Sequence, residues 1–397
     1  MSEFLSPFAT AKFLEGVLEA LPVVRGNFFQ TSLFSGFETR DTKTVNFDQD
    51  FAVNNVSAMF VNAKADVTPI ELGTYGHKEL YFAYTKEGWS DDDFDTLNQR
   101  QIGQAFGQVN VLANNLVNLQ RKAAIAELRI QNLFEVTSTN LAKYGSYLAY
   151  SEKHPKVLYD FGRDVITTAA NLTSKELIPS VNLTTTAVTT PWATTSMPVV
   201  ATSGGFTAGD KMWTKAKVTA GSATPWLDVV KMVQTSRRYS GSPQAIIMQA
   251  TPYNVFNFDV ETNYKDAASL TVQALLNISR DVLPQIKNVD GLTFRRNISL
   301  GDGTVLPVYT YEAKLNDRTS GVEAAILEDG WVMVIPASNL GKKIYGRIQH
   351  KAAQFAAMPR FVHRWTDGKT MTDEYEMHSS FLLGHTKINS LVSWKVS

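Results

Sequence analysis

The sequence predicts an α+β protein built from several parts, on three observations. A proline-free segment carries apolar residues at alternating spacings of three and four over residues 102–133, the pattern of one long helix. Segments on both sides of it alternate apolar and polar residues, the pattern of half-buried strands. Residues 213–338 mix both patterns within a length typical of one compact domain. A chain of 397 residues is also expected to divide into more than one folded unit.

Composition excludes several classes of function. Lys plus Arg equals Asp plus Glu, at 38 each, and this zero net charge argues against a protein that grips nucleic acid through its phosphates. The absence of cysteine excludes disulfides, thiolate metal sites and cysteine nucleophiles. The N-terminus has no signal-peptide pattern, and no apolar run approaches the roughly 18 residues of a membrane-spanning helix. We therefore expect a soluble protein that is made and used in a cytoplasm.

The first part of the chain predicts an arm followed by a hairpin. A short helix is expected over residues 11–21, with Thr10 as its cap and Pro22 at its end, and its single apolar face must lie on another surface. Residues 42–51 predict a strand. The stretch 52–89 lacks a helical period and predicts a long two-stranded hairpin, which has too little apolar surface to be stable alone.

The long helix is the strongest local signal. We expect Ser90 to cap it, the acidic run Asp91–Asp93 to occupy its first turn, and the helical period to end after Tyr144. Gly103 and Gly107 are expected to bend its first part. The pattern fits a helix packed on a sheet or a coiled-coil seam between two chains, and the small alanines in it favour the sheet. Its apolar stripe consists of Ile102, Ala105, Val109, Leu112, Leu116, Leu119, Ala123, Ala126, Ile130 and Leu133.

The second half predicts a compact domain after an irregular segment. Residues 167–209 are rich in Thr, Ser, Ala and Gly and contain three prolines, which indicates a surface insertion. Beyond them the patterns predict helices over 225–237, from 251, and over 267–283. Strands are expected at 245–248, 292–298, 305–312, 324–327, 331–335, 374–383 and 390–396, with turns at 301–303 and 367–368 and with Asp329-Gly330 as a hairpin turn.

The C-terminal third carries a family resemblance. Its segments are Val332-Met333-Val334, Ile344–Gln349, Arg360–Trp365, the turn Thr366-Asp367-Gly368, Glu374–His378 and Ser379–Leu383. With the order of arm, hairpin, long helix, mixed domain and returning strands, these segments resemble the Hong Kong 97-type major capsid proteins of tailed bacteriophages, in their lambda-like branch. The Thr-rich segment is longer than that family pattern needs.

The resemblance implies a division of the chain and a set of partners. The parts would be an N-terminal arm (1–41), an extended hairpin loop with flanking strands (42–89), a peripheral domain with the spine helix (90–165), the insertion (166–212), an axial α+β domain (213–338) and returning peripheral strands (339–397). Subunits of this family form hexamers and pentamers of an icosahedral shell around packaged double-stranded DNA. The implied partners are further copies of the chain, a scaffold protein, a portal, a decoration protein and non-specifically contacted DNA, in a virion assembled in the host cytoplasm.

Candidate contact residues between subunits follow from the arm and the hairpin. They are Lys64, Glu71, Tyr75, His77 and Lys78 on the hairpin and Phe13 and Leu18 on the arm. We expect no catalytic, cofactor or metal site. Two other hypotheses remain beside this one: a soluble enzyme of unrecognised class, and a phage tail or decoration protein.

Four patterns in the sequence could form a binding or catalytic site. Gly204 and Gly209 precede Asp210-Lys211, but the Gly-Lys-Ser/Thr of a phosphate loop is absent, so a flexible loop is favoured. The six histidines show no metal-ligand spacing and are expected to be structural. The acidic run 91–93 could hold a divalent cation, although capping of the helix is the simpler explanation and is favoured. Asp48 and Asp50 share one face of a strand without the partner acid that catalysis would need.

Overall fold

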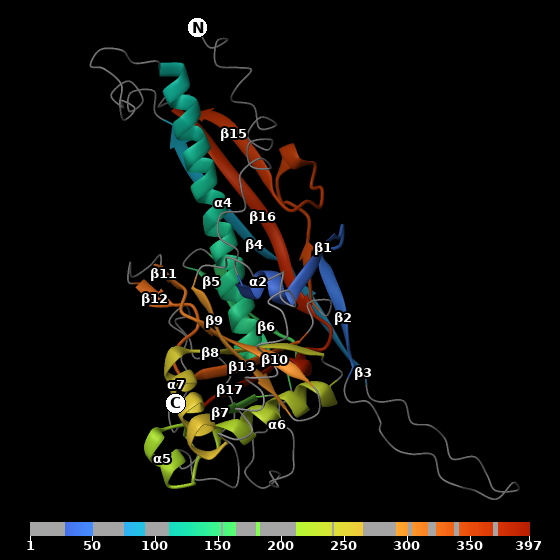
Figure 1. Cartoon of the computed structure of the whole chain (residues 1–397). Helices are drawn as coiled ribbons and strands as arrows, with labels where there is room; N and C mark the ends of the chain where they lie inside the picture. The colour runs from blue at the N-terminus through green and yellow to red at the C-terminus, as the bar shows by residue number, and fades with distance from the viewer. Residues whose placement is uncertain are drawn as a thin grey trace, which may run out of the picture.

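The computed structural model describes residues 28–50, 75–91, 111–151, 154–163, 180–182, 212–239, 242–264, 291–300, 304–316, 323–336, 341–367 and 372–397. In these residues one long helix runs from a five-stranded sheet to a six-stranded sheet (Figure 1). The helices are α2 (Phe28–Leu33), α4 (Val111–Tyr144), α5 (Lys215–Thr219), α6 (Pro225–Arg238) and α7 (Ala250–Asn263). The strands are β1 (Phe34–Thr39), β2 (Thr44–Asp50), β3 (Tyr75–Tyr81), β4 (Ala83–Asp91), β5 (Ser146–Ser151), β6 (His154–Asp160), β7 (Ser180–Asn182), β8 (Pro243–Met248), β9 (Leu292–Ser299), β10 (Val305–Tyr311), β11 (Lys314–Asn316), β12 (Glu323–Ala325), β13 (Trp331–Pro336), β14 (Gly341–Tyr345), β15 (Phe361–Asp367), β16 (Thr372–His385) and β17 (Val392–Lys395).

Helix α4 packs against β4 and β16, as the interpretation of a helix on a sheet predicts (Figure 1). Its 34 residues span about 51 Å at ~1.5 Å per residue. The buried face follows the predicted stripe from Leu119 through Ala123 and Ala126 to Ile130. The two alanines let the helix axis approach the sheet closely.

Two details of the predicted helix are wrong. Ser90 and Asp91 do not cap it, because they close strand β4, where they pair with Glu374 and Asp373 of β16. The pairing with a 14-residue strand outweighs the local preference of these residues for a helix start. Leu133 is 41% exposed, whereas Phe134 is buried, because the period of 3.6 residues places the fourth residue after Ile130 on the inner face.

The five-stranded sheet is organised around β16. Strands β14 and β15 lie end to end along one edge of β16, and β4 pairs with the other edge. Strand β1 continues the sheet beyond β14 in a parallel pairing. The long central strand therefore holds together segments that are almost 300 residues apart in the chain.

The six-stranded sheet has the order β7-β17-β13-β8-β10-β9, and its central strands are buried on both faces. Residues alternate along its central strands, as a pleated strand requires. In β13, Trp331 and Met333 join the core around α4, whereas Val332 and Val334 join the core formed with α6 and α7. Trp213 is completely enclosed in that second core, where it packs on Phe256.

Several predicted elements agree with the structure and others are corrected. Helix α6 begins at Pro225 after Thr224 as predicted, and α7 begins within one residue of the expected Thr251. The turn Asp329-Gly330 is not a hairpin turn, because β12 pairs with β11, and β13 pairs with β8 and β17. Such pairings depend on partners distant in sequence, which a local turn signal cannot specify.

Two expected segment boundaries also differ. Residues 180–182, expected within a surface insertion, form β7 and extend the six-stranded sheet beside β17. Strand β17 itself lies in that sheet, so the returning segment 339–397 divides between the two large sheets. The expected helices over 11–21 and 267–283, the turns at 301–303 and 367–368, and most of 167–209 lie wholly or partly outside the described residues. Among the helices that are described, none combines the length and the apolar character needed to cross a membrane.

Candidate functional site

The strands β2 and β3 form a two-stranded sheet of their own that leaves the five-stranded sheet at two joints (Figure 1). Strand β1 leads into β2 through residues 40–43, and β3 leads into β4 through Phe82. A two-stranded ribbon has little intrinsic stability, so its direction depends on how these joints are held. The two joints are therefore the candidate functional site.

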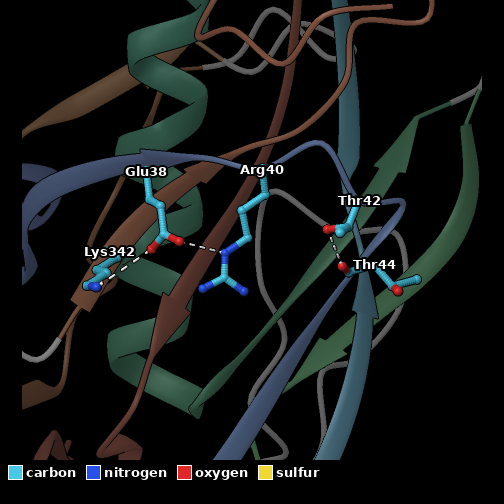
Figure 2. Close-up of polar contacts among 5 residues, drawn as sticks. All are labelled: Glu38, Arg40, Thr42, Thr44 and Lys342. Atoms are coloured by element: carbon cyan, nitrogen blue, oxygen red, sulfur yellow. Dashed lines mark hydrogen bonds and ion pairs between the residues drawn. The ribbon is translucent and has the colours of Figure 1, made fainter.

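The first joint is held by a charged cluster (Figure 2). The Glu38 carboxylate accepts a hydrogen bond from Arg40 Nε at 2.7 Å and lies 3.6 Å from Lys342 Nζ on β14. The hydrogen bond from Arg40 and the positive charges of Arg40 and Lys342 lower the pKa of Glu38, and partial desolvation opposes them. All three side chains remain partly exposed, so the cluster contributes more to geometry than to stability.

Backbone contacts complete this joint. The Arg40 N–H donates to the Tyr345 carbonyl at 2.8 Å, the last such contact before the chain leaves the sheet. The Thr42 hydroxyl then donates to the Thr44 carbonyl at 2.7 Å and closes the turn into β2 (Figure 2). Asp41 lies 3.7 Å from Arg347. The turn is thus tied to the segment 345–347.

The second joint rests on the same segment. The ring of Phe82 covers Gly346 so closely that a Cβ atom on that glycine would lie 2.6 Å from the ring. Gly346 is fixed in turn, because its N–H donates to the Ser380 carbonyl of β16 at 2.9 Å. Both ends of the hairpin are therefore held by residues 345–347, a segment that begins at the last residue of β14.

Two large aromatic side chains are exposed at the base of the hairpin. Phe37 on β1 is 69% exposed and Tyr81 at the end of β3 is 62% exposed. The Phe37 ring lies 6.2 Å from the ring of Tyr345, so this aromatic surface continues into the segment that carries the joints. Exposed aromatic side chains are enriched in contact surfaces between proteins.

The structure places some of the predicted contact residues and leaves others outside the described residues. Tyr75, His77 and Lys78 lie on β3, in register with Asp50, Asp48 and Phe47 of β2. Lys64, Glu71, Phe13 and Leu18 lie outside the described residues. The sequence patterns do not predict the residues Glu38, Phe82 and Gly346 at the two joints of the hairpin. Only a small residue within the segment 344–349 could have pointed to them.

The root of the arm is anchored by a buried carboxylate. Glu135 of α4 accepts hydrogen bonds from the backbone N–H groups of Phe29 and Gln30, both at 2.9 Å, and from the Tyr311 hydroxyl at 2.8 Å. Burial raises the pKa of Glu135, and these three hydrogen bonds oppose the rise. Helix α2 is thereby fixed to α4 and to β10 at the point where the described chain begins.

Three histidines gather beside β15 and β16. The ring of His350 lies 4.4 Å from that of His363 and 5.3 Å from that of His378. His378 Nδ1 lies 2.6 Å from the Tyr84 hydroxyl, and its Nε2 lies 3.2 Å from Glu376. Burial is the main cause that lowers the pKa of His363 and of His378. Within the described part of the chain, no three acidic, histidine or cysteine side chains are arranged to hold a metal ion.

Comparison with known proteins places this architecture. No protein-family model and no curated protein matches the sequence. Among solved structures, a prophage protein of E. coli CFT073 that has been proposed to be a capsid protein is 15% identical, with a TM-score of 0.53 over 99% of this chain and 96% of its own. A phage-related protein of Bordetella bronchiseptica RB50 gives a TM-score of 0.46 at 9% identity, covering 97% and 96% of the two chains. The capsid asymmetric unit of cyanophage A-1(L) gives 0.44 at 12% identity, covering 95% and 94%.

The first of these likenesses extends over nearly the full length of both chains, from the hairpin strands to β17. The chain has the fold of phage capsid proteins. The predicted α+β fold of the Hong Kong 97 type is thereby confirmed. The expected division into a peripheral and an axial domain stays a prediction.

Proposed function

We propose that this chain is the major capsid protein of a tailed bacteriophage, forming hexamers and pentamers of an icosahedral shell that encloses double-stranded DNA. The observation that carries the proposal is the likeness to a prophage protein along the whole of both chains. A match of this extent includes the long helix, the hairpin strands and both sheets. In this function the chain acts by association with its own copies, and catalysis has no part in it.

The hairpin supports association through its base. The strands β2 and β3 have no third strand to pair with among the described residues, and Phe37 and Tyr81 expose aromatic surface beside them. A neighbouring copy that covered these two rings would remove apolar area from water, at about 25 cal/mol per Å². The fixed joints would let every copy present the hairpin at the same angle, which a closed shell of identical subunits needs.

The further partners are those that a shell of this kind requires. We propose a scaffold protein during assembly, a portal at one vertex, a decoration protein on the outer surface and packaged DNA within, in a virion assembled in the host cytoplasm. Because the chain has no net positive charge to bind phosphates strongly, we propose that its contact with DNA is weak and non-specific.

Assembly is the direct test. The full chain should be expressed with and without the scaffold protein, and the products compared by sedimentation and negative-stain electron microscopy. Capsomers or closed shells are expected. Monomers under every condition, scaffold included, would refute the proposal.

A surface variant localises the contact. The double substitution Phe37→Ser and Tyr81→Ser should leave the circular dichroism and the unfolding midpoint nearly unchanged and reduce shell formation at least tenfold. Leu158→Ser, which changes a side chain that is 45% exposed on the separate β5–β6 sheet, is the matched control. Equal assembly of both variants would remove the hairpin base from the contact.

Deletion of residues 62–76 tests the hairpin as a whole. The variant should keep both folded cores, since the described residues of both cores lie outside the deleted segment. It should fail to close shells. Normal shells from the deletion variant would contradict the role proposed for the hairpin.

A further inference from the structure

Arg163 occupies a buried position where α4, β6 and β17 meet. Its side chain is only 5% exposed. Its Nη1 donates to the carbonyls of Ala142 and Lys143, at 2.9 and 3.0 Å, and lies 2.8 Å from the Ser393 hydroxyl oxygen. One end of the guanidinium thus binds the C-terminus of α4, where a positive charge is favoured. The same end links this helix to the last strand of the chain.

The other edge of the same guanidinium has no acceptor among the described residues. Both Nε and Nη2 of Arg163 are buried, and neither donates to any of the described residues. The N–H groups of these two atoms point in one direction, and guanidinium groups use this edge to bind carboxylates and other oxyanions with two parallel hydrogen bonds. No carboxylate of the described residues forms an ion pair with Arg163. An enclosed positive charge without a counter-charge is energetically costly.

The surrounding backbone is shaped to admit this side chain. Gly145, which ends α4 with φ +69°, lies directly under Arg163, and a Cβ atom there would come within 3.0 Å of Arg163 Nε. The glycine therefore serves both the left-handed turn and the close approach of the arginine.

A buried histidine lies near the guanidinium. Burial, with a further contribution from the charge of Arg163, lowers the pKa of His385 to about 3, against an opposing backbone interaction with Lys387. Neither ring nitrogen of His385 meets hydrogen-bonding geometry with a described residue. The ring is neutral at pH 7, so it can donate one hydrogen bond without adding a second positive charge.

We propose that the Nε and Nη2 edge of Arg163, with His385 nearby, binds a small monovalent anion that accepts hydrogen bonds side by side. A carboxylate-like oxyanion such as formate matches the two parallel donors, and a halide can bridge them. The anion supplies the missing counter-charge and secures the junction between α4 and the six-stranded sheet. Burial lowers the pKa of Arg163 to about 9, which leaves the guanidinium charged at neutral pH and in need of that charge. A water molecule would satisfy the donors but not the charge.

Anion dependence of stability tests this site. Thermal unfolding of the full chain should be followed at constant ionic strength and pH 7 while potassium gluconate, which is too bulky for a buried site, is replaced stepwise by potassium chloride or potassium formate. The melting temperature should rise by several degrees and saturate. A steeper rise with formate than with chloride identifies an oxyanion site, and the reverse identifies a halide site.

Three variants separate this site from general salt effects. Arg163→Gln should abolish the anion-dependent rise. Ser393→Ala should lower the starting melting temperature and keep the rise, because it changes only the Nη1 side of Arg163. Arg238→Gln, at an exposed arginine on α6, should behave as the wild type. A rise of the same size in wild type and Arg163→Gln, or no rise in wild type, would overturn the proposal.

A second measurement covers the case in which Arg163→Gln does not fold. Crystals of the wild-type chain soaked in bromide should give an anomalous difference peak in contact with Nε and Nη2 of Arg163. Absence of a peak there, with bromide bound elsewhere on the surface, would exclude a halide site. Wild-type stability in formate would then decide between an oxyanion site and none.

Discussion

The six-stranded sheet and the β2–β3 hairpin are built from the same kind of strand but differ in what covers them. The central strands β8 and β13 bury nearly every side chain, with one core on each face. Among the described strands, β2 and β3 pair only with each other, and the base of the hairpin carries the exposed Tyr81. Burial on two faces makes the sheet a source of folding stability, whereas the hairpin depends on its joints and on whatever lies against it.

This difference separates folding from assembly within one chain. The joints at Arg40 and Phe82 set the direction of the hairpin while adding little buried area. Substitutions in the sheet should therefore change the free energy of unfolding. Substitutions at the hairpin base should change association and leave that free energy nearly intact.

The largest expected effect comes from truncating the sheet core. Trp331 is completely buried and packs edge-on against Tyr144 at the end of α4, at 5.5 Å between ring centroids. Trp331→Ala should lower the free energy of unfolding by about 3–5 kcal/mol, because it leaves a large cavity. Tyr81→Ala should lower it by less than about 1 kcal/mol. Urea denaturation of both variants measures the contrast, and similar losses for the two would show that the hairpin base belongs to the folding core.

A smaller effect should appear as a pH dependence of the free energy of unfolding. His385 ends β16, and its pKa is about 3 in the folded chain against an ordinary value of 6.5. Below pH 6.5 the unfolded chain binds a proton that the folded chain excludes, so stability falls as the pH drops from 6.5 towards 3. The slope approaches about 1.4 kcal/mol per pH unit for one such group. His363 and His378 act in the same direction.

His385→Asn isolates the contribution of this residue. Denaturant unfolding between pH 4 and pH 7 should show a shallower loss of stability in the variant than in the wild type. An unchanged pH profile in His385→Asn would mean that other groups carry the acid sensitivity.

The sequence could predict the elements but not the contacts between them. The stripe from Leu119 to Ile130 identifies the buried face of α4 because a helical period is local information. The conformation of Ser90 is not determined by its sequence neighbours, since pairing with β16 keeps this residue in a strand. The same holds for residues 180–182, whose place in the six-stranded sheet depends on β17.

The candidate site was predictable to a similar extent. The lack of a helical period placed Tyr75, His77 and Lys78 in a hairpin, and the structure puts them on its strand β3. The joints depend on Phe82 meeting Gly346, a contact across more than 260 residues that no spacing reveals. The capsid resemblance gave the order of parts, and only the structure shows what holds the hairpin to its base.

A modest expected change in folding, with a distinct change in assembly, comes from Gly346→Ala. The added methyl group would lie 2.6 Å from the Phe82 ring, so the ring must move and the second joint must shift. We expect a loss of about 1–2 kcal/mol in unfolding free energy and a marked defect in shell formation. Gly36→Ala is the matched control, because a Cβ on that glycine of β1 meets no atom within 4 Å.

A double variant then decides whether the joint itself is responsible. Phe82→Leu gives the added methyl group room, so Gly346→Ala combined with Phe82→Leu should be less destabilised than the sum of the two single variants. Residues in contact are coupled in this way, commonly by about 0.5–3 kcal/mol, whereas distant residues are additive. Additive losses would mean that Gly346 acts through its bond to Ser380 and not through Phe82. The hairpin would then take its direction from the charged cluster around Glu38 alone.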